Sequence, residues 1–300
     1  MKLSRTLATL FSSLCMAMLA PNAEAAAPTG YSGIFGGGPL YITSKGAPAN
    51  IDELANSGFT EVIVWSVEVK PNGDLNLNGE FPLTSNGVYI GDQTYPDFAS
   101  SMTLLKQGKV KRVTFSIGSS NYGDWEDIAS LVHSQGTGPD SILYKTFAAL
   151  KAAIPAIDAI DFDDENGYDL ASTVQFGVML AGLGYHVMPD PYVKASYWSQ
   201  VVSQINAQAP GTVDGVHLQT YSGGAGNSPC QAQWNFGDVP MLPIVWDLND
   251  SPLRAYRQMS GWQRQCGIVG GGLWLYDDIV GTGTAAKYAK AINFGVKVRP

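Results

Sequence analysis

Hydrophobic and polar positions divide this chain into two kinds of alternating segment. Short, nearly continuous apolar runs predict strands buried on both faces, and longer segments with apolar residues every three or four positions predict amphipathic helices. The predicted strands cover residues 31–35, 61–65, 111–117, 157–163, 185–188, 215–221, 243–246 and 270–275. The predicted helices cover residues 50–57, with Asn50 as the N-terminal cap, and 140–153, 170–183, 194–207, 251–265 and 285–292.

This alternation predicts the fold class and the domain organisation. Eight strands separated by helices in about 270 residues are typical of an α/β protein with the (β/α)8 TIM barrel architecture. We expect residues 27–300 to form one such barrel. Residues 70–97 are rich in Asn, Gly and Pro and predict a long surface excursion with a small hairpin around Gly79. In barrels of this kind the chemistry lies at the C-terminal ends of the strands.

One predicted strand end carries a row of acids. Asp158, Asp161, Asp163 and Glu165 stand at the first, fourth, sixth and eighth positions of residues 158–165. On a strand the last three share a face, and the apolar residues between them face the other way. Stacked carboxylates repel one another, so such a row indicates groups that share protons or bind a ligand. A metal site or a solvated strand end would be the alternatives, but a calcium loop favours Gly and turn residues among its acids.

The acidic row resembles the signature strand of the family 18 glycoside hydrolases, the chitinases and endo-β-N-acetylglucosaminidases, whose usual form is Asp-Gly-x-Asp-x-Asp-x-Glu. Residues 116–119 resemble the family's Ser-x-Gly-Gly, with Ser for the last Gly. Residues 219–221 resemble its sixth-strand motif ending in Tyr, and residues 273–274 its eighth-strand Trp. Ala159 replaces the usual Gly, and Ser222 stands where many members carry Asp or Asn. The resemblance spans most of the chain and is to the compact members without a large inserted domain.

Five residues have expected roles. Those of Glu165 and Asp161 follow from the acidic row, and the resemblance implies those of Asp163, Tyr221 and Trp274. Glu165 would be the general acid, with its pKa raised by neighbouring carboxylates. Asp163 would orient the N-acetyl nitrogen of the sugar, and Asp161, one step deeper, would share a proton with Asp163. Tyr221 would donate a hydrogen bond to the acetamido oxygen, and Trp274 would form the floor of the sugar pocket. Catalysis would then be substrate-assisted.

Further residues are candidates for binding substrate. Gln219 belongs to the same motif as Tyr221, and Trp65 ends a predicted strand. Trp65, Trp125 and Trp246 either extend a sugar-binding cleft or pack in the core. Asp247, just beyond the seventh strand, either binds a sugar hydroxyl or caps the following turn.

Composition and termini narrow the class of protein. With 18 basic and 26 acidic residues, the net charge is −8, which argues against nucleic acid as a partner and suits a neutral glycan. Residues 1–26 have the form of a secretory signal peptide, which would direct the chain to an extracellular or periplasmic location. Cleavage of this peptide would remove Cys15. No later apolar run is long enough for a membrane span.

The two other cysteines, Cys230 and Cys266, are expected to form a disulfide in an oxidising compartment, with free buried thiols as the alternative. His133, His186 and His217 are scattered, and His217 is expected to face into a strand layer. The chain lacks the His-Glu-x-x-His, Cys-x-x-Cys and Gly-x-Ser-x-Gly motifs, so we predict neither a metal site nor a cofactor.

We therefore expect a secreted, monomeric, endo-acting hydrolase of β-1,4-linked N-acetylglucosamine polymers such as chitin. Two alternatives remain open at this point. One is an endo-β-N-acetylglucosaminidase acting on N-glycans, and the other is a catalytically weak, chitin-binding lectin on the same barrel.

Overall fold

The computed structural model describes residues 30–42, 47–120 and 122–297. The predicted signal peptide, residues 1–26 with Cys15, lies outside the described residues. Among the helices within these ranges, none has the length and apolar character needed to cross a membrane.

An inner layer of eight parallel strands confirms the predicted barrel. Their pairing order is β10, β11, β12, β1, β2, β7, β8, β9. Between β9 and β10 the layer is closed by an isolated parallel bridge between Val187 and Val213. The barrel strands are β1 (Tyr31–Gly36), β2 (Glu61–Val69), β7 (Arg112–Ile117), β8 (Ile157–Phe162), β9 (His186–Pro189), β10 (Val216–Gln219), β11 (Met241–Trp246) and β12 (Gly270–Trp274).

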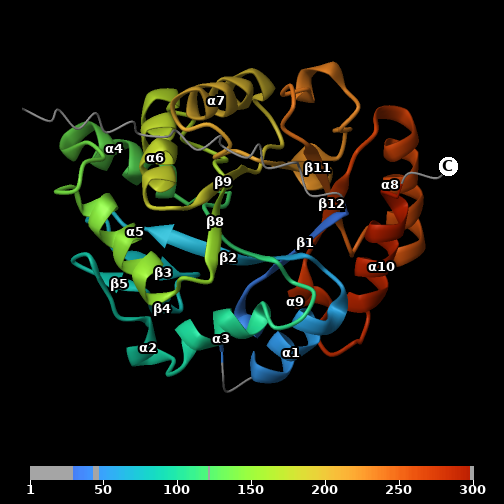
Figure 1. Cartoon of the computed structure of the whole chain (residues 1–300), viewed down its shortest axis with the longest axis horizontal. Coiled ribbons are helices and arrows are strands. Elements are labelled where there is room, and N and C mark those ends of the chain that lie inside the picture. Colours follow the sequence, from blue (N-terminus) through green and yellow to red (C-terminus); the bar gives the residue numbers. More distant parts are fainter. Residues whose placement is uncertain (1–29, 43–46, 121, 298–300) are drawn as a thin grey trace, which may run out of the picture.

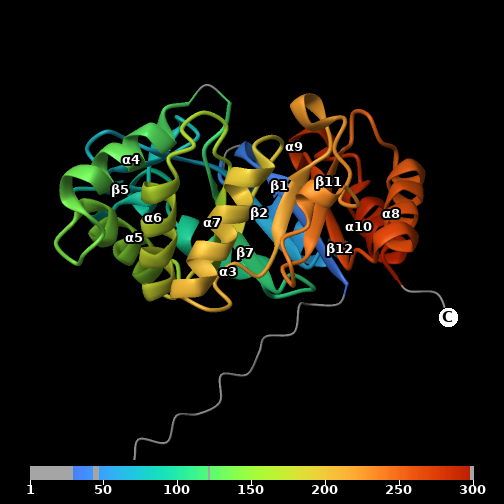
Figure 2. The same ribbon diagram turned by 90° about the horizontal axis from the view of Figure 1, so that it is seen from above.

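Helices surround these strands (Figure 1). Seen from above, α4, α5 and α6 lie toward one end of the molecule, and α8 and α10 lie toward the other (Figure 2). The longer helices are α1 (Ala47–Ser57), α3 (Phe98–Leu105), α4 (Asp124–Gln135), α5 (Ile142–Ala153), α6 (Leu170–Gly182), α7 (Ala195–Gln208), α8 (Pro252–Cys266) and α10 (Ala285–Gly295). The short ones are α2 (Gly91–Thr94), α9 (Tyr276–Ile279) and the 3-10 turns η1 (Gly38–Leu40), η3 (Ser222–Gly224) and η4 (Ala232–Trp234).

The predicted excursion between β2 and β7 is present and contains the predicted hairpin. Strand β3 (Leu75–Leu77) pairs antiparallel with β4 (Phe81–Pro82), and Gly79 in their turn has φ +66°. Strands β5 (Thr84–Ser85) and β6 (Val88–Tyr89) form a second small ladder. Leu75 and Leu77 of β3 and Phe81 of β4 are buried, so this excursion extends the core.

Local sequence signals explain several helix ends. Ser251 accepts a hydrogen bond from the backbone N–H of Arg254 and caps α8, whose first residue is Pro252. Gly184, with φ +82°, follows the end of α6 as predicted. The predicted cap at Asn50 is wrong, because α1 begins three residues earlier. The Asn50 side chain instead donates to the carbonyl oxygen of Pro39.

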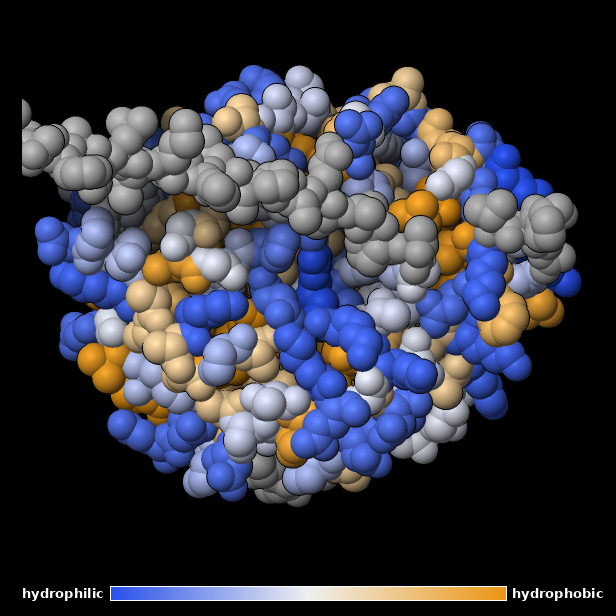
Figure 3. Space-filling model, in the orientation of Figure 1, coloured by the Kyte–Doolittle hydropathy of each residue, from blue (hydrophilic) through white to orange (hydrophobic). Residues whose placement is uncertain are grey.

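The main apolar core lies between the barrel and its helices. Phe162 of β8 points outward and stacks on Phe176 of α6 with a ring-centroid distance of 5.6 Å. The visible surface is largely polar with scattered apolar areas (Figure 3). Three of the exposed large apolar side chains, Leu104, Leu253 and Phe294, come from separate helices.

Candidate active site

The acidic row is divided by the end of β8. Asp161 lies on the strand, Asp163 follows its last residue, and Glu165 lies in the bend beyond it. Asp161 and Asp163 are buried, whereas Glu165 is partly exposed. Because Phe162 points to the helices, the alternation of faces sends Asp161 into the barrel interior as predicted. The three acids therefore form a column from the interior of the barrel to its C-terminal opening.

The other two acids of this segment hold the backbone in place. Both carboxylate oxygens of Asp158 lie 2.7 Å from Nζ of Lys106. One of them also accepts from the backbone N–H of Val113. Asp164 accepts hydrogen bonds from three successive backbone N–H groups, those of residues 166–168. These bonds fix the bend that carries Glu165.

The neighbouring strand β7 supports the column closely. The hydroxyl of Ser116 donates to Oδ2 of Asp161 at 2.7 Å. Gly118 has φ +102°, and a Cβ at this position would lie 2.3 Å from the carbonyl oxygen of Asp163. Only glycine suits both the backbone conformation and the close approach. The Ser-x-Gly segment is thus required by the packing of β7 against β8.

Asp163 and Glu165 hydrogen-bond to each other through their carboxyls, and Gln219 contacts both. Nε2 of Gln219 donates to Oδ1 of Asp163 at 3.1 Å. Burial and the nearby Glu165, Asp161 and Asp164 raise the pKa of Asp163 well above its usual range. Burial also raises the pKa of Glu165, although its bonds to Asp163 and Gln219 oppose the rise. Two hydrogen-bonded carboxyls hold one proton between them, so the pair can supply an acid at neutral pH.

Aromatic rings line one side of this column. The Tyr221 ring lies nearly parallel to the Trp274 ring, with an interplanar angle of 18° and a centroid distance of 6.1 Å. Trp65 meets Trp274 edge to face at 5.1 Å, and Trp246 lies 6.0 Å from Tyr221. Trp65, Trp246 and Trp274 are partly exposed. The Trp65–Ser66 and Trp274–Leu275 peptide bonds are both cis. These rings offer flat apolar surface beside the acids, as a sugar ring requires.

Two of the residues considered for substrate binding have contacts that give them a structural role. Trp125 does not line the cleft, because it is 4% exposed, packs on Phe162 and donates from Nε1 to the carbonyl oxygen of Ile117. Asp247 accepts from the backbone N–H of Leu275 at 3.0 Å, so it braces the segment after β12.

Sequence reasoning missed Asp190, which follows the last residue of β9. It is 3% exposed, and its Oδ1 has no hydrogen-bond partner among the described residues. Burial, and then the charges of Asp161 and Asp163, raise its pKa well above the usual range. Its position at the C-terminal end of a barrel strand was the signal that could have identified it.

The partners of His217 were also missed, although its burial was predicted. Its Nδ1 lies 2.6 Å from Oδ1 of Asp161, and its Nε2 lies 2.7 Å from the Tyr31 hydroxyl. Both contacts lie inside the barrel, at the base of the column of acids. A polar residue between apolar neighbours on a strand gives no indication of which partner it will meet across a barrel.

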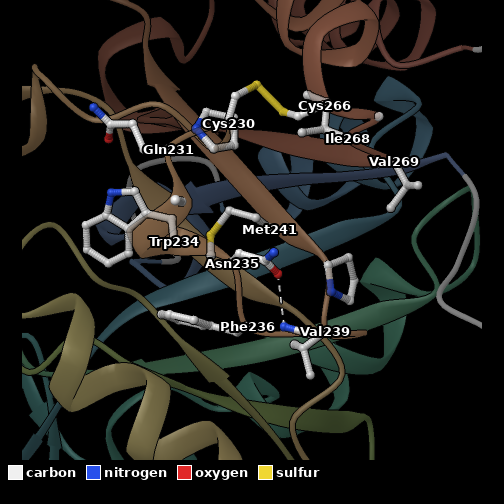
Figure 4. Close-up of a pocket in the computed structure, with 15 residues that line it drawn as sticks. Cys230, Gln231, Trp234, Asn235, Phe236, Val239, Met241, Cys266, Ile268 and Val269 are labelled. Atoms are coloured by element: carbon white, nitrogen blue, oxygen red, sulfur yellow. Dashed lines mark hydrogen bonds between the residues drawn. A yellow bond between two sulfur atoms is a disulfide. The ribbon is translucent and has the colours of Figure 1, made fainter.

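The predicted disulfide between Cys230 and Cys266 is present. It joins the loop after β10 to the end of α8, beside a hollow of about 290 Å³ (Figure 4). Trp234, Phe236 and Met241 contribute to its lining, which includes no charged side chain. The hollow therefore lacks an acid or base, and the disulfide braces the segment that follows Tyr221.

Residues 30–42, 47–120 and 122–297 contain no cluster of three or more His, Cys, Asp or Glu side chains suited to a metal ion.

Comparisons of the sequence with protein-family models and with curated proteins found no match. Solved structures do share the fold. The catalytic domain of a family GH18 chitinase from the fern Peteris ryukyuensis is 15% identical, with a TM-score of 0.56, covering 89% of this chain and 100% of that one. The Bacillus cereus spore cortex-lytic enzyme SleL is 12% identical, with a TM-score of 0.58, covering 89% and 74%.

The catalytic domain of the hyperthermophilic chitinase from Pyrococcus furiosus is 13% identical, with a TM-score of 0.54, covering 84% of this chain and 86% of that one. At such identities the likeness concerns the fold. The chain thus has the (β/α)8 barrel seen in GH18 chitinase catalytic domains, as the sequence motifs predicted.

Proposed function

We propose that this protein is a glycoside hydrolase that cleaves β-1,4 linkages of N-acetylglucosamine polymers by substrate-assisted, retaining catalysis. The observation that carries the proposal is the hydrogen-bonded pair of Asp163 and Glu165, held by Gln219 beside the stacked rings of Tyr221 and Trp274. The pair supplies a proton and a negative charge at one point, and the rings supply a surface for a sugar.

In the first step Glu165 donates its proton to the glycosidic oxygen, and the bond to the anomeric carbon breaks. The carbonyl oxygen of the sugar's own N-acetyl group attacks that carbon from the opposite face and closes a protonated oxazoline (oxazolinium) ring, whose nitrogen keeps its proton. Asp163 accepts a hydrogen bond from the acetamido N–H and stabilises its growing positive charge. The Tyr221 hydroxyl donates to the acetamido oxygen and orients it for attack.

In the second step Glu165, now a carboxylate, removes a proton from a water molecule. The water oxygen bonds to the anomeric carbon, the oxazoline opens, and Glu165 regains its proton. Two displacements at one carbon restore the β configuration. The aromatic side chains Trp65, Trp246 and Trp274 support sugar binding by stacking.

The substrate follows from this mechanism. The sugar beside Glu165 must carry an N-acetyl group, which suits chitin and its oligosaccharides. The chitobiose core of an N-glycan also presents this group and is the second candidate. A lectin role is disfavoured because the acid, Glu165, is present. A signal-like segment at residues 1–26 and the disulfide support secretion, and we propose a monomer that acts without a cofactor.

The test is to incubate the purified protein with chitin oligosaccharides and, in parallel, with a glycan carrying a chitobiose core, and to identify products by mass. Cleavage between two N-acetylglucosamine units of the oligosaccharides would support the proposal. Cleavage of the N-glycan alone would favour the second candidate. Binding of both without cleavage would contradict an enzymatic function.

A further inference from the structure

At the base of the column of acids lies a buried polar cluster inside the barrel, which includes Asp161 and which we call the His217 cluster. It is contributed by five different strands, β1, β2, β7, β8 and β10, and its members are less than 5% exposed. Those members are Tyr31, Glu61, Thr114, Ser116, Asp161 and His217. Five strands meet at these side chains, so their charges act on the base of the active site.

Both oxygens of Asp161 have a hydrogen-bond partner. Oδ1 lies 2.6 Å from Nδ1 of His217, and Oδ2 accepts from the Ser116 hydroxyl at 2.7 Å. A proton on Oδ2 would displace the Ser116 donor, and a proton on Oδ1 that donated to Nδ1 would leave His217 neutral beside the buried carboxyl of Glu61. The geometry therefore favours Asp161 as a carboxylate.

His217 also faces a second carboxylate. Its Nε2 lies 2.7 Å from the Tyr31 hydroxyl and 3.5 Å from Oε2 of Glu61, whose other oxygen accepts from Thr114. Two fully buried carboxyls on opposite sides of one imidazole are stable only if a cation offsets their charge. An imidazolium can donate to Asp161 and to Tyr31 at the same time.

Other titratable groups surround the cluster. Asp163 and Asp190 are buried carboxyls near it, and burial raises the pKa of both well above the usual range. Arg112 of β7 pairs with Asp214 toward the other end of the barrel. Burial lowers the pKa of His217, but its hydrogen bond to Asp161 and the nearby carboxyls of Glu61 and Asp161 outweigh burial and raise it to about 10. Burial raises the pKa of Asp161, against the effect of His217 and Ser116.

We propose that His217 is a permanently charged positioning residue that keeps Asp161 ionised and confines the exchangeable proton of the site to Asp163 and Glu165. This replaces the sharing of a proton between Asp161 and Asp163 that the sequence led us to expect. Its consequences for catalysis rest on the proposed function, whereas the charge state of His217 does not.

The charge state is measured directly in the wild-type protein. Isotope labelling of histidine gives ring-nitrogen NMR signals from three residues, and the His217→Asn variant assigns the buried one. The more exposed His133 serves as the internal comparison. We expect both ring nitrogens of His217 to carry protons throughout pH 5–8. A neutral imidazole with a single protonated nitrogen anywhere in this range would overturn the proposal. This result is readable whether or not the protein cleaves a glycan.

A kinetic test measures the effect on the site. In His217→Asn the amide can still donate near the Nδ1 position, but the positive charge is lost. Removal of a cation raises the pKa of every nearby carboxyl, so the pH profile of kcat/KM should move to higher pH by about one unit or more. The matched variant His186→Asn removes a histidine that pairs with Asp214 and should not shift the profile.

An unshifted profile in folded, active His217→Asn would contradict the positioning role. If that variant does not fold, the NMR measurement on the wild-type protein decides the question. Absence of glycan cleavage by the wild type would count against the proposed function. The charge of His217 would still be decided by the NMR measurement.

Discussion

The ring of Tyr221 lies almost parallel to that of Trp274, with their centroids 6.1 Å apart and their planes inclined by 18°. One ring follows β10 and the other ends β12, so the contact spans β11 and aligns two barrel strands. Tyr221 is 9% exposed, and Trp274 is more open. The two residues therefore have different roles. Trp274 provides the stacking surface, and Tyr221 provides a hydroxyl in a fixed position.

Replacement of Tyr221 by Phe keeps the stacked ring and removes only the hydroxyl. We expect kcat to fall by about 10²–10³-fold with little change in KM, because the hydrogen bond to the acetamido oxygen strengthens in the transition state. Steady-state kinetics on a chitin oligosaccharide measure both values. Tyr185→Phe is the control, since its hydroxyl donates to the carbonyl oxygen of Phe147 away from the site. A rise in KM alone for Tyr221→Phe would assign the hydroxyl to ground-state binding.

Attack by the acetamido group predicts the anomeric configuration of the first product. The first product should be the β-anomer, observed by NMR before mutarotation, because two displacements retain configuration. A thiazoline analogue of the oxazoline should inhibit, and fully deacetylated chitosan or cellulose oligomers should not be cleaved. Early α-anomer, or efficient cleavage of the deacetylated polymer, would be incompatible with substrate assistance.

The disulfide between Cys230 and Cys266 should stabilise the fold more than it affects chemistry. We expect the double variant Cys230→Ser, Cys266→Ser to lose about 2–4 kcal/mol of unfolding free energy in urea. Thiol titration of the denatured, unreduced protein checks the bond itself. Two reactive thiols in that assay would show that the cysteines are free.

Asp124 makes stability depend on pH. It is 4% exposed and accepts from the backbone N–H of Val69, and burial raises its pKa to about 6. A folded-state pKa above the unfolded value adds stability at low pH, which is lost as the pH rises through about 6. Asp124→Asn keeps the acceptor and removes the charge.

Between pH 4 and pH 7.5, the wild type should therefore lose about 2 kcal/mol of unfolding free energy that Asp124→Asn does not lose. Denaturant titrations at both pH values measure the difference. Asp140→Asn, at an exposed position, is the control and should behave as the wild type. Equal pH dependence in wild type and Asp124→Asn would contradict the assignment.

The eight barrel strands were predictable because each is a short apolar run bounded by polar residues. Two of the longer helices, α3 and α4, were not predicted, although Trp125, Ile128 and Leu131 have helical spacing and are buried on one face of α4. The long polar excursion before them obscured the α3 pattern, which rests on Phe98, Met102 and Leu105. In both cases the information was local and was overlooked.

Only part of the candidate site could be predicted from the periodicity of the sequence. The acidic row identified Asp161, Asp163 and Glu165, because strand periodicity places alternate residues on one face. Asp190 and the partners of His217 depend on which strands meet across the barrel. Those contacts join residues tens of positions apart and leave no periodic trace in the sequence. Gln219 was expected to contact substrate, and its amide is found on Asp163.

The central claim is that Glu165 is the proton donor of a glycoside hydrolase, and the most direct measurement is the turnover of Glu165→Gln on a chitin oligosaccharide. The amide fits the same space and cannot donate the proton to the leaving oxygen. We predict a loss of about 10²–10⁴-fold in kcat, with the circular dichroism spectrum and oligosaccharide binding retained. A folded variant that keeps most of the wild-type turnover would contradict this account of the site.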